Sequence, residues 1–391
     1  MDIMAGEAAC RPIPFSAFVE QGPAAKESLW EASRLINSAK TPVILLGLMA
    51  SKPKFATAIR NLLGITIVPV VATFQAAGAL SRQEFEHFGG RVGQLANQAA
   101  DALLDSADVV ITIGYVPIEY WPSLWNRGKD RPIIHIDVTP PDIENDYVPA
   151  LELIGNVEET LSALSPLLRA RQKAPESAEL LEIIALDRRR RMALAAATSG
   201  VPVHPMRLIS ELQEILTPDV TLCSDIGSFS LYLCRYLVSF RARQFLISNG
   251  QQTLGVALPW AIAATIVRPG EKVLSISGDG GFLFSASELE TAVRLNSHIV
   301  HMIWIDGAYN MVGVQEQIKY GRTSGVEFGP VDYVKYAEAF GATGLRIERP
   351  DEIAPTLRKA FDTPGPVLIG VNVDYRDNIK LFEDVHEGSI L

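Results

Sequence analysis

Short runs of β-branched and aliphatic residues alternate with longer amphipathic stretches through most of the chain. In the first half the apolar runs cover residues 43–46, 67–72, 109–113 and 133–137. In the second half they cover residues 220–223, 272–276 and 299–305, with further runs near Leu345 and Val367. Helical spacing is found over residues 95–107, 206–216, 257–267 and 285–295. This alternation is typical of βαβ units and predicts an α/β fold with two doubly wound parallel-sheet domains.

The alternation also predicts a division of the 391 residues into four segments. We expect an N-terminal linker over residues 1–27, a first α/β domain over 28–170, a connector over 171–203 and a second α/β domain over 204–391. The connector contains four consecutive arginines at residues 188–191. They could form an anion-binding patch, but a solvated helix face is the favoured interpretation in an acidic chain.

Composition limits the class of function. A formal net charge of -10 and a pI near 5.2 disfavour a protein that wraps nucleic acid or coats an anionic membrane. No apolar run approaches the roughly 18 residues of a membrane span, and residues 1–14 show no export signal. Cys10, Cys223 and Cys234 have no disulfide or zinc spacing. We therefore expect a cytoplasmic enzyme that acts on small molecules.

A glycine cluster follows the apolar run at residues 272–276. Gly278, Asp279, Gly280 and Gly281 lie between an expected strand and an expected helix, where unhindered backbone N–H groups can approach a phosphate. A glycine turn of this kind often serves packing alone. Asp279 makes the turn more specific, because a carboxylate would repel phosphate unless a cation lay between them. Mg²⁺ commonly joins carboxylates to diphosphate oxygens.

A second carboxylate stands at the end of the next expected strand. Asp306 follows the apolar run at residues 299–305, so that one helix and one strand separate it from Asp279. Parallel neighbouring strands place both acids at the same sheet edge. The sequence therefore predicts a magnesium site there; the alternative is two acids that contact only water.

This arrangement resembles the signature of the thiamine-diphosphate enzymes, which is Gly-Asp-Gly, a helix, a strand and then an Asn or Asp metal ligand. The resemblance extends over nearly the whole chain and is strongest to the catabolic, FAD-independent acetolactate synthases. It is carried by residues 45–51, 74–78, 236–244, 248–260, 309–312 and 326–330.

The resemblance implies thiamine diphosphate and Mg²⁺ as cofactors, with FAD not expected. The implied metal ligands are the side chains of Asp279 and Asp306 and the backbone carbonyl of Ala308. Relatives commonly have glycine at the position of Ala308, so an alanine would be strained and metal affinity reduced if the turn requires a positive φ.

Further cofactor-binding residues follow from the same resemblance. Leu254 would support the bent cofactor beneath its thiazolium ring, although an ordinary core leucine is the simpler interpretation. The Gln252 carbonyl would accept from the aminopyrimidine amino group. The other implied contacts, near the diphosphate and in the motif after Asp306, are Gly227, Ser228, Tyr309 and Asn310, together with Gly278, Gly280 and Gly281.

The implied reaction is decarboxylation of pyruvate and carboligation to a second pyruvate, which gives 2-acetolactate and CO₂. Gln315 stands where relatives that favour 2-ketobutyrate have tryptophan, so we expect Gln315, with Met311 nearby, to contact the second pyruvate. An unrelated surface glutamine is the alternative.

The family's usual order is a pyrimidine-binding domain, a middle domain and a diphosphate-binding domain, and the sequence matches the second and third. The pyrimidine-binding domain carries the glutamate that activates the cofactor. We therefore expect activity to need such a domain in trans or a full-length subunit, within a homo-oligomer. Two alternatives stay open: a noncatalytic remnant that binds cofactor or pairs with subunits, and a pyruvate oxidase or decarboxylase of the same superfamily.

Overall fold

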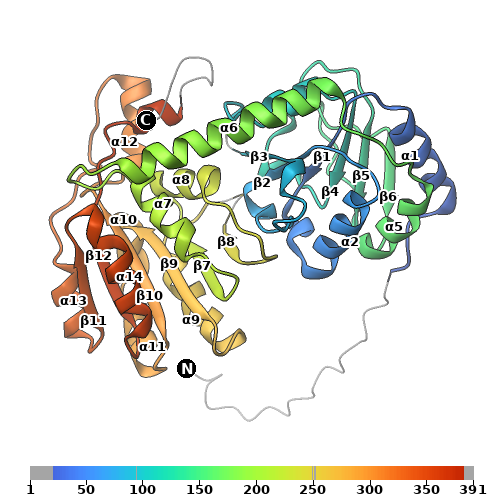
Figure 1. The fold of residues 1–391 in the computed structure, drawn as a ribbon. Coiled ribbons are helices and arrows are strands. Elements are labelled where there is room, and N and C mark those ends of the chain that lie inside the picture. Colours follow the sequence, from blue (N-terminus) through green and yellow to red (C-terminus); the bar gives the residue numbers. More distant parts are fainter. Residues whose placement is uncertain (1–20, 94, 249, 251, 383–391) are drawn as a thin grey trace, which may run out of the picture.

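The computed structural model describes residues 21–93, 95–248, 250 and 252–382 of the 391-residue chain. These residues form two six-stranded sheets in which all paired strands are parallel, and helices cover both faces of each sheet (Figure 1). The prediction of two doubly wound α/β domains is therefore confirmed.

The first sheet has the strand order β3-β2-β1-β4-β5-β6. Its strands are β1 (Pro42–Leu46), β2 (Val70–Thr73), β3 (Phe88–Val92), β4 (Val109–Ile113), β5 (Ile133–Asp137) and β6 (Leu151–Ile154). Every residue of β1, β2, β4 and β5 is buried, as expected for strands covered on both faces. The winding direction reverses between β1 and β4, which is where sheets of this kind usually bind ligands.

Alternate residues of these strands face two different layers of helices. One layer consists of α1 (Lys26–Ser38), α2 (Pro53–Leu63) and α5 (Val157–Leu164). The other consists of α3 (Asp101–Ser106), α4 (Pro122–Trp125) and the first half of α6 (Pro175–Ala197). The period of two residues in a strand thus divides β1 between both cores.

The second sheet has the strand order β11-β12-β10-β9-β7-β8. Its strands are β7 (Val220–Ser224), β8 (Phe245–Ile247), β9 (Lys272–Gly278), β10 (Ile299–Ile305), β11 (Thr343–Ile347) and β12 (Val367–Asn372). Here the winding direction reverses between β7 and β9, so the carboxyl ends of these two strands form the expected ligand edge.

Helices again cover both faces of this sheet. One layer consists of α7 (Pro205–Ile215), α8 (Ser228–Tyr236) and α14 (Ile353–Asp362). The other consists of α9 (Ala257–Val267), α10 (Asp279–Ser285), α11 (Glu288–Arg294) and α13 (Tyr333–Ala339). A further helix, α12 (Asn310–Tyr320), begins just beyond the carboxyl end of β10. The strands of the ligand edge are thereby held between two apolar layers.

Helix α6 runs from the first domain to the second (Figure 1). Its residues Leu181 and Ile184 belong to a core of the first domain, whereas Ala195 belongs to a core of the second. The connector therefore packs against both sheets.

The four arginines of α6 divide between two environments. Arg189 and Arg190 are exposed, in agreement with a solvated helix face. Arg188 instead lies over the ring of Phe85, 4.3 Å from its centroid, and Arg191 pairs with Asp187 at 2.6 Å. The expectation of a solvated face therefore holds for half of the run.

The two domains share a buried polar contact. Arg91 of β3 donates a hydrogen bond from Nη1 to the carbonyl oxygen of Cys234 in α8, at 3.0 Å, and is almost entirely buried. Burial lowers the pKa of Arg91 to about 10. Phe74 and Ala77 of the first domain also belong to the core cluster of the second. The two domains thus pack directly against each other at this contact.

Several predicted elements differ from the structure. The predicted strand at residues 67–72 is shifted to Val70–Thr73, and the predicted helix at 95–107 is only Asp101–Ser106. The predicted helix at 285–295 corresponds mainly to α11 (Glu288–Arg294), because α10 already ends at Ser285. The strands β3, β6 and β8 were not predicted.

Two further expectations concern cysteine and membranes. Cys223 and Cys234 are buried free thiols. Residues 1–14, in which we expected no export signal, lie outside the described residues, and so does Cys10. Among the helices that the structure describes, none combines the length and apolar character of a membrane span.

Candidate cofactor and metal site

The two predicted metal-binding carboxylates lie at adjacent strand ends. Asp279 follows β9 directly and Asp306 follows β10, and Gly278 is in register with Trp304 of that strand. Asp279 Oδ2 accepts hydrogen bonds from the backbone N–H groups of Asp306, at 3.1 Å, and Gly307, at 2.7 Å. Asp279 therefore fixes the loop that carries the second carboxylate.

The electrostatics of this pair favour a cation. Burial, and then the nearby charge of Asp279, raise the pKa of Asp306 to about 7. Burial also raises the pKa of Asp279, against the effect of hydrogen bonds from backbone N–H groups. A divalent ion between the two carboxylates would offset both their burial and their mutual repulsion.

The loop after Asp306 provides a third oxygen without the strain expected at Ala308. The positive φ of this turn, 77°, falls on Gly307, and Ala308 has no positive φ. The condition under which Ala308 would be strained is therefore not met. Within the described part of the chain, no hydrogen bond is donated to the Ala308 carbonyl oxygen, so it is free to act as a ligand.

The glycine cluster is the first turn of α10 rather than a loop before the helix. Gly278 is the N-cap, and Asp279, Gly280 and Gly281 are helical. A Cβ on Gly280 would lie 2.7 Å from the ring of Tyr309. The glycine thus lets Tyr309, a predicted cofactor residue in the loop after Asp306, pack directly on the start of α10.

Asn310 connects three segments at the site. Its Oδ1 accepts hydrogen bonds from Ser228 Oγ at 2.6 Å and from Asn378 Nδ2 at 2.7 Å, and its side chain also bonds Asp306. Ser228 is the first residue of α8 and follows Gly227, the N-cap. The predicted residues Gly227, Ser228 and Asn310 therefore lie together with Asp306.

Two residues that sequence reasoning missed support this edge. Asp225, one residue beyond β7, is buried, and its carboxylate accepts hydrogen bonds from the Gly255 N–H at 3.0 and 2.9 Å. Burial raises the pKa of Asp225 to about 6. An acid directly after a strand, as with Asp279 and Asp306, was the available signal. The other residue, Asn378, is distant in sequence and gave no signal.

Through its hydrogen bonds to Gly255, Asp225 also holds the segment that contains the predicted cofactor residues Gln252 and Leu254. Leu254 precedes Gly255 and is half-buried, and a Cβ on Gly255 would lie 2.7 Å from Cβ of Phe284 in α10. Gln252 has a positive φ of 51°, which is uncommon for a residue other than glycine. This segment is thus tied to the helix that carries the glycine cluster.

The predicted substrate residues lie one turn apart on α12. Met311 is partly buried and packs against the core of the second domain, whereas Gln315 is exposed. A spacing of four residues places both on one side of the helix. Met311 and Gln315 thus follow the loop at residues 306–309 closely in the chain, but among the described residues Gln315 makes no contact that tests its role.

In the first domain, a protein side chain occupies the ligand edge of the sheet. Glu119 is 3% exposed and accepts hydrogen bonds from the Leu48 N–H, at 3.0 and 2.9 Å, and from Thr73 Oγ1, at 2.6 Å. Leu48 follows β1 and Thr73 ends β2, so both donors lie near the point where the winding direction of the sheet reverses, between β1 and β4. Burial raises the pKa of Glu119 to about 7. The backbone N–H that could bind a phosphate here is therefore already used.

Comparison with known proteins agrees with this geometry. Residues 29–164 match the sequence model of the thiamine pyrophosphate enzyme central domain, and residues 225–371 match that of the C-terminal TPP binding domain. The chain is 47% identical to a catabolic acetolactate synthase of Raoultella terrigena over 395 aligned residues, which cover 100% of the chain and 70% of that relative. The chain belongs to the acetolactate synthase family of thiamine pyrophosphate enzymes.

Further relatives agree with this family assignment. The chain is 47% identical to an acetolactate synthase of Bacillus subtilis, over 93% of the chain and 64% of the relative. It is 28% identical to a putative thiamine pyrophosphate-containing protein of the same organism, over 89% of the chain and 59% of the relative. These acetolactate synthases are thus longer than the chain, which spans about two thirds of their length.

The residues present fit the family cofactor. Asp279 and Asp306 together with the Ala308 carbonyl would hold Mg²⁺, and the N-termini of α8 and α10 face the same edge for a diphosphate group. Within the described residues, no group of three or more His, Cys, Asp or Glu side chains could hold a metal ion, and one or two carboxylates are what Mg²⁺ usually takes from a protein.

Proposed function

We propose that the chain forms the magnesium- and diphosphate-binding part of an enzyme that joins two pyruvates into 2-acetolactate and CO₂. The observation that carries the proposal is the pairing of Asp279 with the Asp306 loop at the reversal of the second sheet. The names of the relatives, both acetolactate synthases at 47% identity, support this reaction class. When bound, thiamine diphosphate would supply the nucleophilic carbon and the electron sink.

The residues of this chain would orient the reactants and exclude water. Asp279, Asp306 and Ala308 would hold the metal, and Leu254 would support the cofactor. Gln315 and Met311 would contact the second pyruvate at the start of α12. We further propose that the first domain binds no flavin, because Glu119 already accepts the N–H of Leu48 at its ligand edge.

We also propose that activity needs a pyrimidine-binding domain from another polypeptide segment. Apolar side chains are exposed on α10, the helix that carries the glycine cluster: Leu283 is 40% exposed and Phe284 is 62% exposed. An apolar surface of this kind fits contact with a further domain or a second subunit.

The proposal is tested by separating cofactor binding from turnover. Calorimetry with Mg²⁺ and thiamine diphosphate should show binding to the chain alone. Incubation with pyruvate should then yield little 2-acetolactate until the N-terminal segment of the Raoultella relative is added in trans. Binding without turnover after this addition would indicate a noncatalytic remnant, and acetaldehyde or acetate as product would indicate a decarboxylase or an oxidase. Brisk turnover by the chain alone would overturn the need for a partner.

A further inference from the structure

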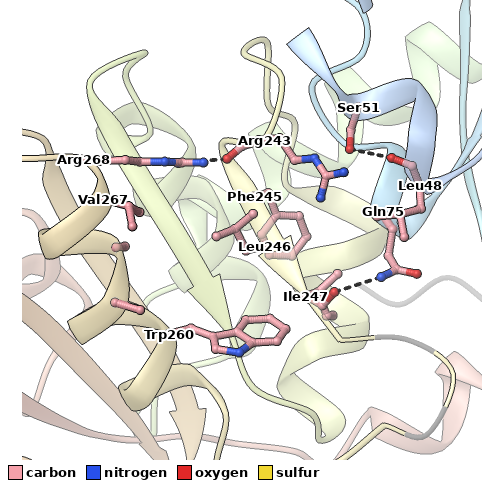
Figure 2. Close-up of a pocket in the computed structure, with 12 residues that line it drawn as sticks. Leu48, Ser51, Gln75, Arg243, Phe245, Leu246, Ile247, Trp260, Val267 and Arg268 are labelled. Atoms are coloured by element: carbon pink, nitrogen blue, oxygen red, sulfur yellow. Dashed lines mark hydrogen bonds between the residues drawn. The ribbon is translucent and has the colours of Figure 1, made fainter. Parts of the chain in front are cut away.

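A pocket lies at the boundary between the two domains, apart from the candidate cofactor site. Its volume is about 420 Å³, and none of its lining residues belongs to the predicted cofactor or metal residues. Leu48, Ser51 and Gln75 line it from the first domain, and residues of β8 and α9 line it from the second (Figure 2). The volume falls within the range of pockets for small organic ligands.

Most of the lining side chains are apolar. Phe245 and Ile247 of β8, Trp260 and Val267 of α9, and Leu48 surround the space. Figure 2 shows the rings of Phe245 and Trp260 on one side and the first-domain residues on the other. An apolar or aromatic group could therefore be enclosed between two domains that already pack together.

A single arginine lacks a counter-charge in this setting. Arg243 lines the pocket and is half-buried, and its guanidinium makes no hydrogen bond or ion pair with any residue that the structure describes. Its neighbour Arg268 is held by a hydrogen bond to Thr221 Oγ1 at 2.7 Å. Burial, and then the charge of Arg268, lower the pKa of Arg243. An anion in the pocket would offset both effects.

The backbone at this arginine is also unusual. Arg243 has a φ of 57°, in the left-handed region that non-glycine residues seldom adopt. Arg268 Nη1 donates to the Arg243 carbonyl oxygen at 3.0 Å and holds this conformation. Strained backbone that is fixed by its surroundings is commonly found where a side chain has to be aimed.

Gln75 provides a second polar group, from the first domain. Its Nε2 donates to the Ile247 carbonyl oxygen at 3.2 Å, which fixes the amide across the domain boundary. The pocket therefore combines a fixed amide, a guanidinium without a described partner and an apolar lining.

We propose that this pocket binds a small organic monocarboxylate with an apolar body. The carboxylate would pair with the planar guanidinium of Arg243, which matches it with two parallel hydrogen bonds. The apolar body would pack against Phe245 and Trp260. A ligand bound here would contact both domains at a place that the proposed reaction does not use.

The test uses 4-phenylbutyrate as the probe and 4-phenylbutan-1-ol as its uncharged match. Calorimetry should show saturable binding of the carboxylate to the full chain. Arg243→Met should weaken this binding about tenfold, because one charge-assisted pair is lost, and Arg243→Lys should restore part of it. Arg322→Met, at an exposed arginine outside the pocket, is the matched control and should bind as the unaltered chain does.

A second variant tests the place rather than the charge. Ala263 lines the pocket and is exposed, so Ala263→Trp should fill the space and abolish binding while circular dichroism shows an unchanged fold. Equal affinities for the acid and the alcohol, or unaltered binding in both Arg243→Met and Ala263→Trp, would overturn the proposal.

Discussion

Asn378 donates a hydrogen bond from its Nδ2 to Oδ1 of Asn310 at 2.7 Å, and this bond joins the C-terminal segment to the candidate metal loop. Asn378 starts the short helix η8 (Asn378–Leu381) and is almost fully buried. The carbonyl of Leu381, at the end of this helix, accepts hydrogen bonds from Asn97 of the first domain and from Arg235. The first domain is thereby connected to the side chain that bonds Asp306.

We predict that Asn378→Ala weakens the binding of Mg²⁺ and thiamine diphosphate by about tenfold, because Asn310 loses one of the bonds that orient it toward Asp306. Calorimetric titration measures this change. Asn37→Ala removes a comparable hydrogen bond to Leu167 in the first domain and is the matched control. If both variants lose the same amount of affinity, Asn378 has no specific role in positioning.

Asp279→Asn should weaken magnesium-dependent cofactor binding by at least about tenfold, since it removes a ligand charge and places an amide donor near backbone N–H groups. Binding is followed by calorimetry at a fixed concentration of thiamine diphosphate. The control is Asp332→Asn, at an exposed acid that caps α13 and lies away from the site. Unchanged affinity in Asp279→Asn would contradict the proposal that Asp279 is a magnesium ligand.

Stability should depend on the protonation of Glu119. Its pKa is about 7 in the folded protein, against an ordinary value of 4.5, so the folded state retains a proton between these values that the unfolded state releases. The associated stabilisation is complete below pH 4.5 and is lost as the pH rises through 7.

This difference predicts that raising the pH from 5 to 8 lowers the melting temperature of the unaltered chain more than that of Glu119→Gln. Thermal unfolding at a series of pH values, with Glu338→Gln as an exposed control, measures it. Parallel curves for the chain and the Glu119→Gln variant would contradict the proposed titration.

His301 should be important for stability rather than for catalysis. It is fully buried in β10, and its two ring nitrogens lie 2.7 Å from Ser275 Oγ and 2.9 Å from Ser277 Oγ of β9. His301→Leu would leave both hydroxyls unpaired and should lower the free energy of unfolding by about 2 kcal/mol. Urea unfolding at neutral pH tests this, and a loss below about 0.5 kcal/mol would show that the hydroxyls find other partners.

The sequence was informative where strands are long, apolar and central. β9 and β10 each have seven residues that are nearly all buried, so their ends could be located and the pairing of Asp279 with Asp306 could be predicted. By contrast, β3 contains two glycines and the buried Arg91, and β8 has only three residues. Such short or polar strands are formed by tertiary packing and not by local preference.

The supporting residues of the site were harder to predict for a related reason. Asp225 and Asn378 act through backbone or side-chain bonds to residues 30 and 68 positions away. Asp225 follows a strand directly, as Asp279 and Asp306 do, but nothing in the local sequence distinguishes Asn378 from an ordinary polar residue. The sequence also left open whether Ala308 has a positive φ, because the position of a single left-handed residue depends on the hydrogen bonds of the whole loop; in the structure it is Gly307.

The burial of Arg91 between the domains bears on how this protein could be divided. Two family models meet in this chain, and a cut in α6 would separate them as sequence modules. Such a cut would leave one half with an exposed arginine in an apolar recess and the other with an open core that has lost Phe74. Each module cut out at α6 would therefore expose surface that the other module now buries, and we expect each to be less stable alone than in the intact chain.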